Sequence, residues 1–434
     1  MSAIGHLTTG LFLLSSLASV TATAATLSEE VVEPHAYTDA DDARFSGVAV
    51  LSEGHLVLAA NDSDERAIDS TGNASASRDD EPEKDPGPSL NLTYRGYGIS
   101  LGDSKGVKGI RLNYRDSQLQ SVYGVNATLW APFEYQTSGA VTGLALGLPV
   151  TGAESIEGIA LSLFAAGTKG DFTGVDVSGL GFVAGNTFTG IGVSGIGRVS
   201  GDNSQGIQAA GLGLVAGDNF SGAGLSGVGL VAGKNFGGLG VSGVGLVAGD
   251  DFRGIGVAGI GLVAGRDLRG IGISGIGLVS GGRVKGIAVG GIAVVGGDEL
   301  TGLSLAGVAA AGGPIRGVSI AGLAVASEEI TGVGIGTLGV AAGRVRGLTV
   351  GAVVGAGEYT GLALAPAHFR ISKGGQFNGL AVSAWNRIKG NNAGWTIGLL
   401  NDASHSEGYQ IGLINVVRDN PKWLRVLPLF NRSF

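Results

Sequence analysis

The chain contains no cysteine in 434 residues, and other scarcities narrow its class further. Without cysteine it can form no disulfide bond, and it cannot carry a lipid on a cysteine thiol. Only 10 prolines accompany 83 glycines, and the glycines do not recur at every third position, which excludes a collagen helix. Apolar stretches are interrupted by glycine before they reach about 20 residues, so we expect no membrane-spanning helix.

The N-terminal region differs in composition from the rest of the chain. An apolar run from Leu11 to Leu17 precedes the small residues Ala22, Thr23 and Ala24, which is typical of a secretory signal peptide over residues 1–24. Residues 25–89 are rich in Asp and Glu, and we expect them to be mostly disordered. Within them, Val48 to Ala60 has the pattern of a small β-hairpin, although the pattern does not decide between hairpin and coil.

The remainder of the chain repeats one glycine-led unit, with the sequence Gly-Φ-x-Φ where Φ is apolar. Its step is 16 residues through the centre and varies between 14 and 19 elsewhere, as in stacked repeat arrays with modified ends. The regular repeats span residues 158–366, between degenerate repeats and caps at 90–157 and 367–434. The aligned glycines are Gly109, Gly124, Gly143, Gly158, Gly174, Gly190, Gly206, Gly222, Gly238, Gly254, Gly270, Gly286, Gly302, Gly317, Gly332, Gly347, Gly361, Gly379, Gly394 and Gly408.

Each unit reads as two short strands joined by a corner and a wider turn. After Gly238, apolar residues alternate with glycines at a period of two, which predicts a strand. The pair Ser242-Gly243 then breaks the alternation, and it resumes one step out of phase before the turn at Gly249. The repeat region therefore predicts an all-β fold.

Two architectures fit such units: a β-solenoid of about twenty coils, or an antiparallel transmembrane β-barrel. The Ser-Gly break recurs in nearly every central unit, and the wide turns all resemble one another, as coils related by translation require. Their first residues alternate in sign, through Asp218, Lys234, Asp250 and Arg266. Stacked coils place these opposite charges side by side, whereas a barrel pairs like charges. The pattern favours the glycine-rich β-solenoid and keeps the barrel as the alternative.

A thin solenoid interior explains the glycines. We expect bulky Val, Ile and Leu to fill it, because their alternate neighbours are glycines that form flat outer faces. Phenylalanines of successive turns should stack as an aromatic ladder, and the valines that share the parity of the outward glycines should form an outer ridge. The ladder comprises Phe188, Phe220, Phe236 and Phe252, and the ridge comprises Val215, Val231, Val247, Val263, Val279 and Val295.

The C-terminal segment GYQIGLINVVRDNPKWLRVLPLF, Gly408 to Phe430, resembles the tail of a bacterial family of exported "surface repeat" proteins. The units from Gly394 to Asn401, Gly124 to Trp130 and Gly143 to Pro149 are similar to repeats of the same family. The central repeats have Gly or Ser where that family has Gln and Asn. The resemblance implies an exported, envelope-associated protein, and it implies no known activity.

No residue pattern indicates a catalytic, cofactor-binding or metal site. The glycines from Gly227 to Gly233 lack the spacing and the Lys-Ser/Thr of nucleotide-binding loops. Acidic pairs such as Asp250-Asp251 are interrupted by basic turns, which argues against calcium. His368 and His405 are the only histidines of the repeat region. The segment Ser404 to Glu407 contains the residue types of a hydrolase triad, but adjacent residues on one strand or loop do not make a triad. The remaining acidic pairs are Asp298-Glu299 and Glu328-Glu329.

Aromatic residues concentrate outside the central repeats, where we expect them to cap the ends of the core. The alternative is a sugar- or partner-binding surface near the ends. These residues are Tyr94, Tyr97, Tyr114, Tyr123, Trp130, Phe133, Tyr135, Trp385, Trp395, Tyr409 and Trp423.

The sequence thus predicts an exported, non-enzymatic structural or interaction protein of the bacterial envelope or surface. The alternative function, which accompanies the barrel, is an outer-membrane pore. The expected partners are an envelope component or a second copy, bound through the Gly/Val face. Association with a membrane stays open, and no nucleic acid is expected as a partner.

Overall fold

The computed structural model describes residues 50–52, 55–57, 88–116, 119–130 and 139–434. The chain divides into two units, residues 1–76 and 77–434. In the first unit, β1 (Val50–Ser52) pairs antiparallel with β2 (His55–Val57), so of the two alternatives for this segment the structure has the hairpin. The expected signal peptide and nearly all of the acidic segment lie outside the described residues.

The second unit consists of β-strands, and its described residues contain no helix. In the regular region, a longer strand alternates with a shorter one. The N-terminal strands are β3 (Ser89–Tyr94), β4 (Tyr97–Gly102), β5 (Gly106–Asn113), β6 (Ser121–Thr128) and β7 (Ala140–Gly147). The longer strands are β9 (Ser155–Ser162), β11 (Phe172–Ser178), β13 (Phe188–Ser194), β15 (Ser204–Ala210), β17 (Phe220–Ser226), β19 (Phe236–Ser242), β21 (Phe252–Ala258), β23 (Leu268–Ser274), β25 (Arg283–Gly290), β27 (Glu299–Ala306) and β29 (Ile315–Ala321). The shorter strands are β8 (Val150–Ala153), β10 (Ala165–Thr168), β12 (Gly181–Ala184), β14 (Gly197–Ser200), β16 (Gly213–Ala216), β18 (Gly229–Ala232), β20 (Gly245–Ala248), β22 (Gly261–Ala264), β24 (Gly277–Ser280), β26 (Ala293–Gly296) and β28 (Ala309–Gly312). The C-terminal strands are β30 (Ala324–Gly336), β31 (Gly339–Val350), β32 (Val353–Ile371), β33 (Gln376–Asn392), β34 (Trp395–Ser406), β35 (Tyr409–Val417) and β36 (Val426–Asn431).

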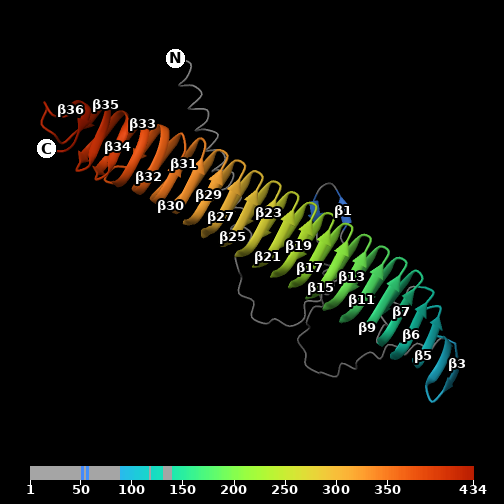
Figure 1. Ribbon diagram of the computed structural model, residues 1–434. Coiled ribbons are helices and arrows are strands. Elements are labelled where there is room, and N and C mark those ends of the chain that lie inside the picture. The colour runs from blue at the N-terminus through green and yellow to red at the C-terminus, as the bar shows by residue number, and fades with distance from the viewer. Residues whose placement is uncertain (1–49, 53–54, 58–87, 117–118, 131–138) are drawn as a thin grey trace, which may run out of the picture. The chain divides into compact units, whose positions relative to one another are not determined.

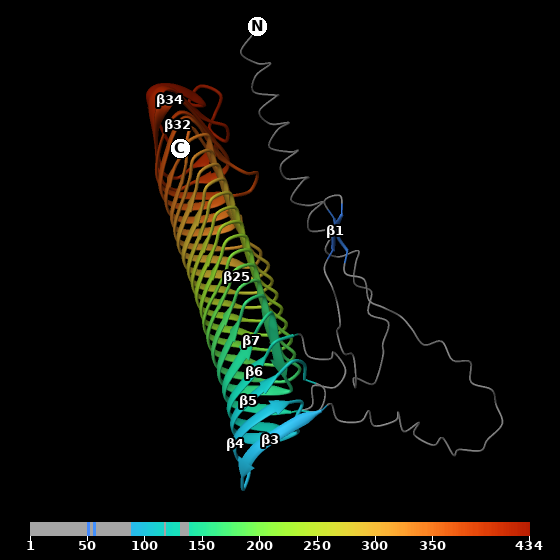
Figure 2. The same cartoon turned by 90° about the vertical axis from the view of Figure 1, so that its right-hand side faces the viewer.

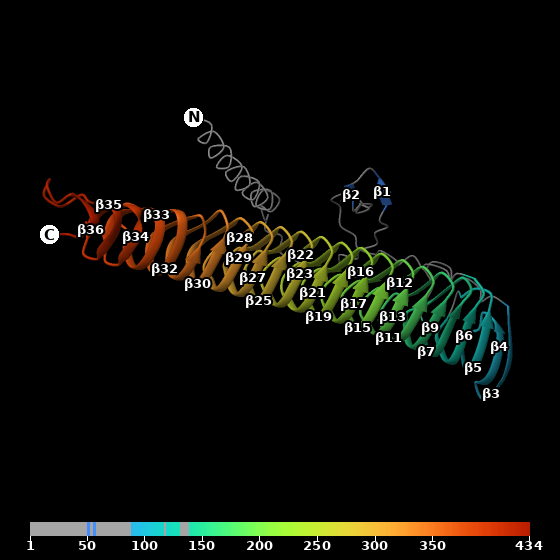
Figure 3. The ribbon, with the colours of Figure 1, turned by 45° about the horizontal axis from the view of Figure 1, so that its top comes forward.

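Successive coils stack in parallel, and each residue pairs with its equivalent one repeat away. Strand β19 lies between β17 and β21, with Gly238 between Gly222 and Gly254. Strand β20 likewise lies between β18 and β22. Figures 1 and 3 show this stacking along one axis. The unit is a β-solenoid of about 19 turns, as predicted, and the antiparallel barrel alternative is wrong because neighbouring coils run in the same direction.

Glycine columns allow the coils to approach one another closely. Gly254 has a φ of 129°, which disfavours residues with a side chain, and a Cβ there would overlap the carbonyl oxygen of Gly238. The corner glycine Gly243 would meet the carbonyl oxygen of Gly227 in the same way. These positions therefore require glycine because backbone of the preceding coil lies where a side chain would begin.

The core lies between the longer and shorter strands and contains phenylalanine and leucine from both. Phe236 stacks on Phe220 and Phe252, with ring centroids 5.1 and 4.9 Å apart, which confirms this part of the predicted ladder. Phe188 instead stacks on Phe172 at 5.1 Å. Ser204 occupies the ladder position between Phe188 and Phe220, so the predicted ladder is interrupted there.

The predicted orientation of the longer strands is wrong. Gly240 faces the core, whereas Leu239 is 45% exposed and Val241 is half-buried. A Cβ on Gly240 would lie 2.5 Å from Leu246 and 2.8 Å from Phe236, so these two side chains already fill the interior. Steric demand therefore places glycine inside this strand and the aliphatic residues outside.

Antiparallel strands terminate the stack at both ends. Strand β3 pairs with β4 at one end, and β36 pairs with β35 at the other. Figure 2 shows the coils between these ends, with the β3–β4 pair at the N-terminal end of the stack. Within the residues that the structure describes, no helix is long and apolar enough to cross a membrane.

Candidate interaction surface

Four columns of aliphatic side chains cover the outside of the regular coils, and we call them the apolar flank. In the coil of β19 and β20 they are represented by Leu239, Val241, Val244 and Val247; Val244 and Val247 are 39% and 36% exposed. Each column continues through neighbouring coils because the strands pair in register, and its members are exposed or half-buried. The predicted valine ridge is the Val247 column and does face outward. The first column runs Val175, Ile191, Ile207, Ala223, Leu239, Ile255, Ile271 and Ile287; the second runs Val177, Val193, Ala209, Leu225, Val241, Val257, Ile273 and Val289; the third runs Leu180, Ile196, Leu212, Val228, Val244, Ile260, Ile276 and Ile292.

The backbone of the apolar flank donates its hydrogen bonds along the stack, even at the corner. The N–H of Gly243 donates to the carbonyl of Ser226 at 3.1 Å. The N–H groups of Val244 and Gly245 both donate to the carbonyl of Val228, at 2.9 and 3.0 Å. The corner therefore exposes aliphatic side chains, while its three backbone N–H groups are all hydrogen-bonded within the protein.

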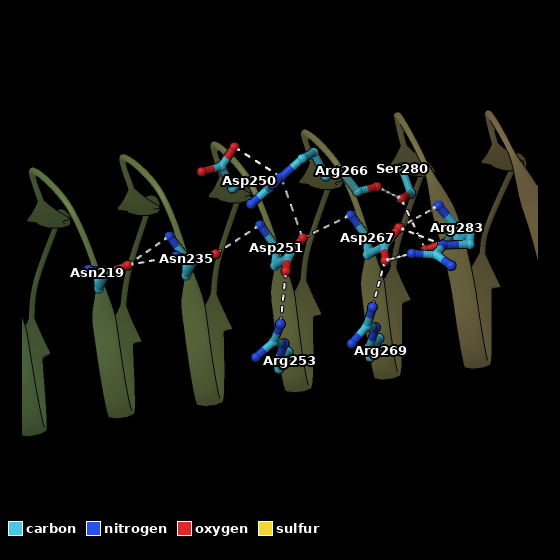
Figure 4. A network of polar contacts seen from close by, with 10 residues as sticks. All are labelled: Asn219, Asn235, Asp250, Asp251, Arg253, Arg266, Asp267, Arg269, Ser280 and Arg283. Carbon is cyan, nitrogen blue, oxygen red and sulfur yellow. Dashed lines mark hydrogen bonds and ion pairs between the residues drawn. The ribbon is translucent and has the colours of Figure 1, made fainter.

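Charged residues gather at the wide turns, which the shorter strand separates from the corner at Gly243, and they form a charged ridge along the stack. Figure 4 shows part of this ridge. Lys234 lies 2.9 Å from Asp218, and Arg266 lies 3.2 Å from Asp250. The predicted alternation of charge between stacked turns is thus confirmed. Because these side chains are largely exposed, each pair contributes little stability. The charged ridge comprises the turn residues Asp218, Asn219, Lys234, Asn235, Asp250, Asp251, Arg266, Asp267 and Arg283 and the adjacent strand residues Arg253 and Arg269.

Asp267 is the most heavily bonded carboxylate of the charged ridge. Its oxygens accept from Arg283 Nη2 at 2.8 Å, from the Arg283 backbone N–H at 3.0 Å and from Arg269 Nη2 at 2.8 Å. These donors, with Arg283 first, hold the pKa of Asp267 well below its usual range. Arg253 likewise bonds Asp251 at 2.9 Å, which explains how the stacked pair Arg253 and Arg269 is tolerated.

A buried ion pair interrupts the apolar core, and sequence reasoning missed it. Arg198 Nη1 lies 2.5 Å from Asp176, and both side chains are almost fully buried. The guanidinium also lies 4.6 and 4.5 Å from the ring centroids of Phe182 and Phe188. Burial raises the pKa of Asp176 and lowers that of Arg198, while their mutual attraction opposes both changes. The sequence does contain a signal for this pair, because Arg198 occupies the repeat position at which the next coil has Leu214.

Polar networks also close the core at its two ends. Near the N-terminal end, the buried Arg111 guanidinium bonds Asp116 and, at 3.0 Å, Asn126. Near the C-terminal end, the side-chain amide of Asn401 donates to Asn415 at 2.7 Å and accepts from Asn386. The Asn residues that resemble the surface-repeat pattern, Asn401 and Asn415, therefore face the interior, where they bond to each other and to backbone carbonyls.

The aromatics predicted to cap the core ends mostly lie outside it. Tyr94 and Trp423 are both 77% exposed, and Trp395 is 51% exposed. Trp395 contacts Tyr409 on the exterior, with ring centroids 4.9 Å apart. The capping prediction is wrong for these residues because polar side chains close the core instead. Phe133 and Tyr135 lie outside the described residues.

The histidines considered in the sequence do not converge. His368 contacts Trp385 in the next coil, whereas His405 pairs in register with Asn391, in a different column. His405 Nδ1 lies 3.2 Å from Ser433 Oγ, and its Nε2 lies 3.9 Å from Glu407. The second distance is too long for the hydrogen bond that a catalytic triad requires.

The acidic pairs and glycine loops are parts of the stacked coils, and Glu328 and Glu329 lie within strand β30. Glu329 lies 3.6 Å from both Arg344 and Arg346. Among the described residues, no group of three or more metal-ligating side chains is present. Gly227 and Gly233 occupy the corner and turn columns, where a Cβ would overlap the carbonyl oxygens of Gly211 and Gly217. Their role in close stacking accounts for the glycine spacing.

Comparisons with protein-family models, with curated proteins and with solved structures found no match to this chain. The candidate surface therefore rests on its own geometry. That geometry defines an elongated repeat scaffold with an apolar flank and a charged ridge.

Proposed function

We propose that the protein is an exported, non-enzymatic scaffold of the bacterial cell envelope or surface that presents β faces to a partner. The main observation that supports this proposal is the apolar flank, which continues through the stacked β-coils. Exposed apolar surfaces of more than a few hundred Å² are typical of interaction sites. The signal-like N-terminus and the resemblance to surface-repeat proteins support the location.

The distribution of functional groups supports a binding role over catalysis. Catalysis needs a few different groups that converge on one reacting atom. Here the coils repeat the same aliphatic positions, and the charged ridge pairs its acids with neighbouring bases, as in Asp250 with Arg266. Repetition of one surface suits contact with an extended partner, because every coil adds a similar increment of contact area.

Cell fractionation tests this proposal. A full-length chain with a C-terminal tag should appear in the envelope fraction of the producing bacterium, and its mature N-terminus should lie near Ala25. Intact chain that still begins at Met1 and remains in the cytoplasm would contradict export. A matched chain that lacks residues 1–24 should remain cytoplasmic and serves as the control for the fractionation.

A further inference from the structure

The apolar flank is too extensive for one sheet-to-sheet contact to cover. With coils about 4.8 Å apart, the eight coils of the apolar flank give a length of about 40 Å. The two columns of Leu239 and Val241 occupy a strip about 10 Å wide, or about 400 Å². That area is about half of the ~800 Å² that each partner contributes to an ordinary protein interface. A second copy packed on this strip would still leave the columns of Val244 and Val247 in water.

The chemistry of the apolar flank meets the requirements of contact with hydrocarbon. From Val175 to Ile292 its four columns contain only Val, Ile, Leu and Ala. A lipid interior offers no partners for free backbone donors, so such donors are costly there. The N–H groups of the corner at Gly243, Val244 and Gly245 are all bonded to the preceding coil, as the strands are by parallel pairing.

The charged ridge makes the coils amphipathic around their circumference. Lys234 and Arg266 have side chains 56% and 63% exposed, and each contacts an acid of the preceding turn. Because its bases are paired with acids, this ridge has little excess positive charge to attract anionic headgroups. An apolar flank opposite a charged ridge is the same amphipathic division that lets helices lie in a membrane interface.

We propose that the apolar flank binds the acyl-chain region of a lipid layer, with the solenoid axis along the layer and the charged ridge in water. This inference rests on the proposed function and names its partner class. The driving force is burial of aliphatic side chains, so binding should extend to vesicles of neutral phosphatidylcholine. The affinity for vesicles should also change less than about twofold between 0.05 and 0.5 M salt. Salt screens attraction between charges, and here the paired charges of the ridge do not supply the binding energy.

The absence of cysteine allows a site-specific test with the full chain. Val247→Cys and Lys234→Cys, each labelled with an environment-sensitive fluorophore, place probes on the apolar flank and the charged ridge of adjacent coils. On addition of phosphatidylcholine vesicles, we expect a blue shift and a several-fold increase in emission for the Val247→Cys probe. The Lys234→Cys probe should change little.

Lysine substitutions provide matched variants. Leu239→Lys with Ile255→Lys should weaken vesicle binding at least about tenfold, because charge replaces two buried aliphatic contacts. Gln205→Lys with Ser221→Lys adds the same charge in the exposed column that carries Arg253, and it should leave binding unchanged. Circular dichroism of all variants checks that the β-structure is retained.

Two outcomes would overturn the lipid proposal. One is a Val247→Cys probe that does not respond to vesicles. The other is a blue shift that appears without vesicles and grows with protein concentration, which would assign the apolar flank to a second copy. In either case, envelope fractionation with a processed N-terminus would leave the proposed scaffold function standing, so the two failures are distinguishable.

Discussion

At the scale of single residues, two different steric demands select glycine in this protein, and some glycines meet neither of them. Gly254 and Gly243 make room for the backbone of the preceding coil, and Gly240 makes room for core side chains. Gly245 has no heavy atom within 4 Å of the place where a Cβ would stand. Its column contains alanine in later coils, at Ala293 and Ala309. Glycines only two positions apart, such as Gly243 and Gly245, should therefore tolerate substitution very differently.

Alanine substitution should separate these roles. Gly254→Ala combines a positive φ with backbone overlap, and we expect it to destabilise the protein by more than about 3 kcal/mol. Gly245→Ala should be neutral or stabilising by up to about 1 kcal/mol, because alanine restricts the unfolded chain. Thermal unfolding followed by circular dichroism measures both. Equal destabilisation by the two variants would contradict the assigned roles.

The buried pair Arg198 and Asp176 should behave as a coupled unit. Arg198→Leu alone leaves a buried carboxylate without its cation and should cost about 3–5 kcal/mol. The double variant Arg198→Leu with Asp176→Gly adopts the residues that neighbouring coils use, Leu214 and Gly192. It should be neutral or more stable than the parent by about 1–4 kcal/mol. If the double variant is no more stable than Arg198→Leu, the loss of stability does not come from the unpaired Asp176 carboxylate, and the predicted coupling is wrong.

At the scale of elements, the wide turn is ordered by side chains that bond to the next coil. Asn219 accepts the backbone N–H of Asn235 at 3.3 Å, and Asp267 accepts that of Arg283. A backbone N–H of one turn thereby donates to a side-chain oxygen of the preceding turn, as Figure 4 shows. These turns depend on stacking because most of their bonding partners belong to another coil.

Asp267 makes the stability of this element depend on pH. Because Arg283 and Arg269 lower its folded pKa, its stabilising effect is present above the unfolded pKa, near 4, and is lost progressively as the pH falls below that value. Asp267→Asn should therefore lower the melting temperature at pH 7. The difference from the parent should shrink between pH 4 and pH 2.

Melting curves of the two proteins at each pH measure this effect. Asp218→Asn is a suitable control because the Asp218 carboxylate is more exposed and pairs with the flexible Lys234 side chain. A difference between Asp267→Asn and the parent that stays constant down to pH 2 would contradict the linkage.

At the scale of the whole molecule, nearest-neighbour stacking makes coils removable as units. Deletion of residues 234–265 removes two complete coils and joins Gly233 to Arg266. Asp218 then faces Arg266, and Phe220 faces Leu268, so charge and core columns remain compatible. We expect a folded protein shortened by about 10 Å, as measured by small-angle scattering.

Deletions of other lengths supply the comparison. Removal of one coil, residues 234–249, places Asp218 beside Asp250 and should cost about 0.5 kcal/mol more than the two-coil deletion. Removal of residues 244–251 shifts the downstream side chains into the wrong columns and should abolish cooperative unfolding. A half-coil deletion as stable as the two-coil deletion would contradict stacking in register.

The sequence by itself determined the period of the repeat, the parallel stacking of coils and the alternation of charge along the turns. These features follow from local order along the chain, since each coil meets an almost identical copy of itself. Only the tertiary structure decided which side of each longer strand faces inward. Alternation at a period of two does not say which of the two sets of residues faces inward, so the pattern alone allows either Leu239 or Gly240 to face the core. Gly240 faces inward because Phe236 and Leu246 already fill the interior. The position of the apolar flank, and with it the candidate site, follows from that competition for space.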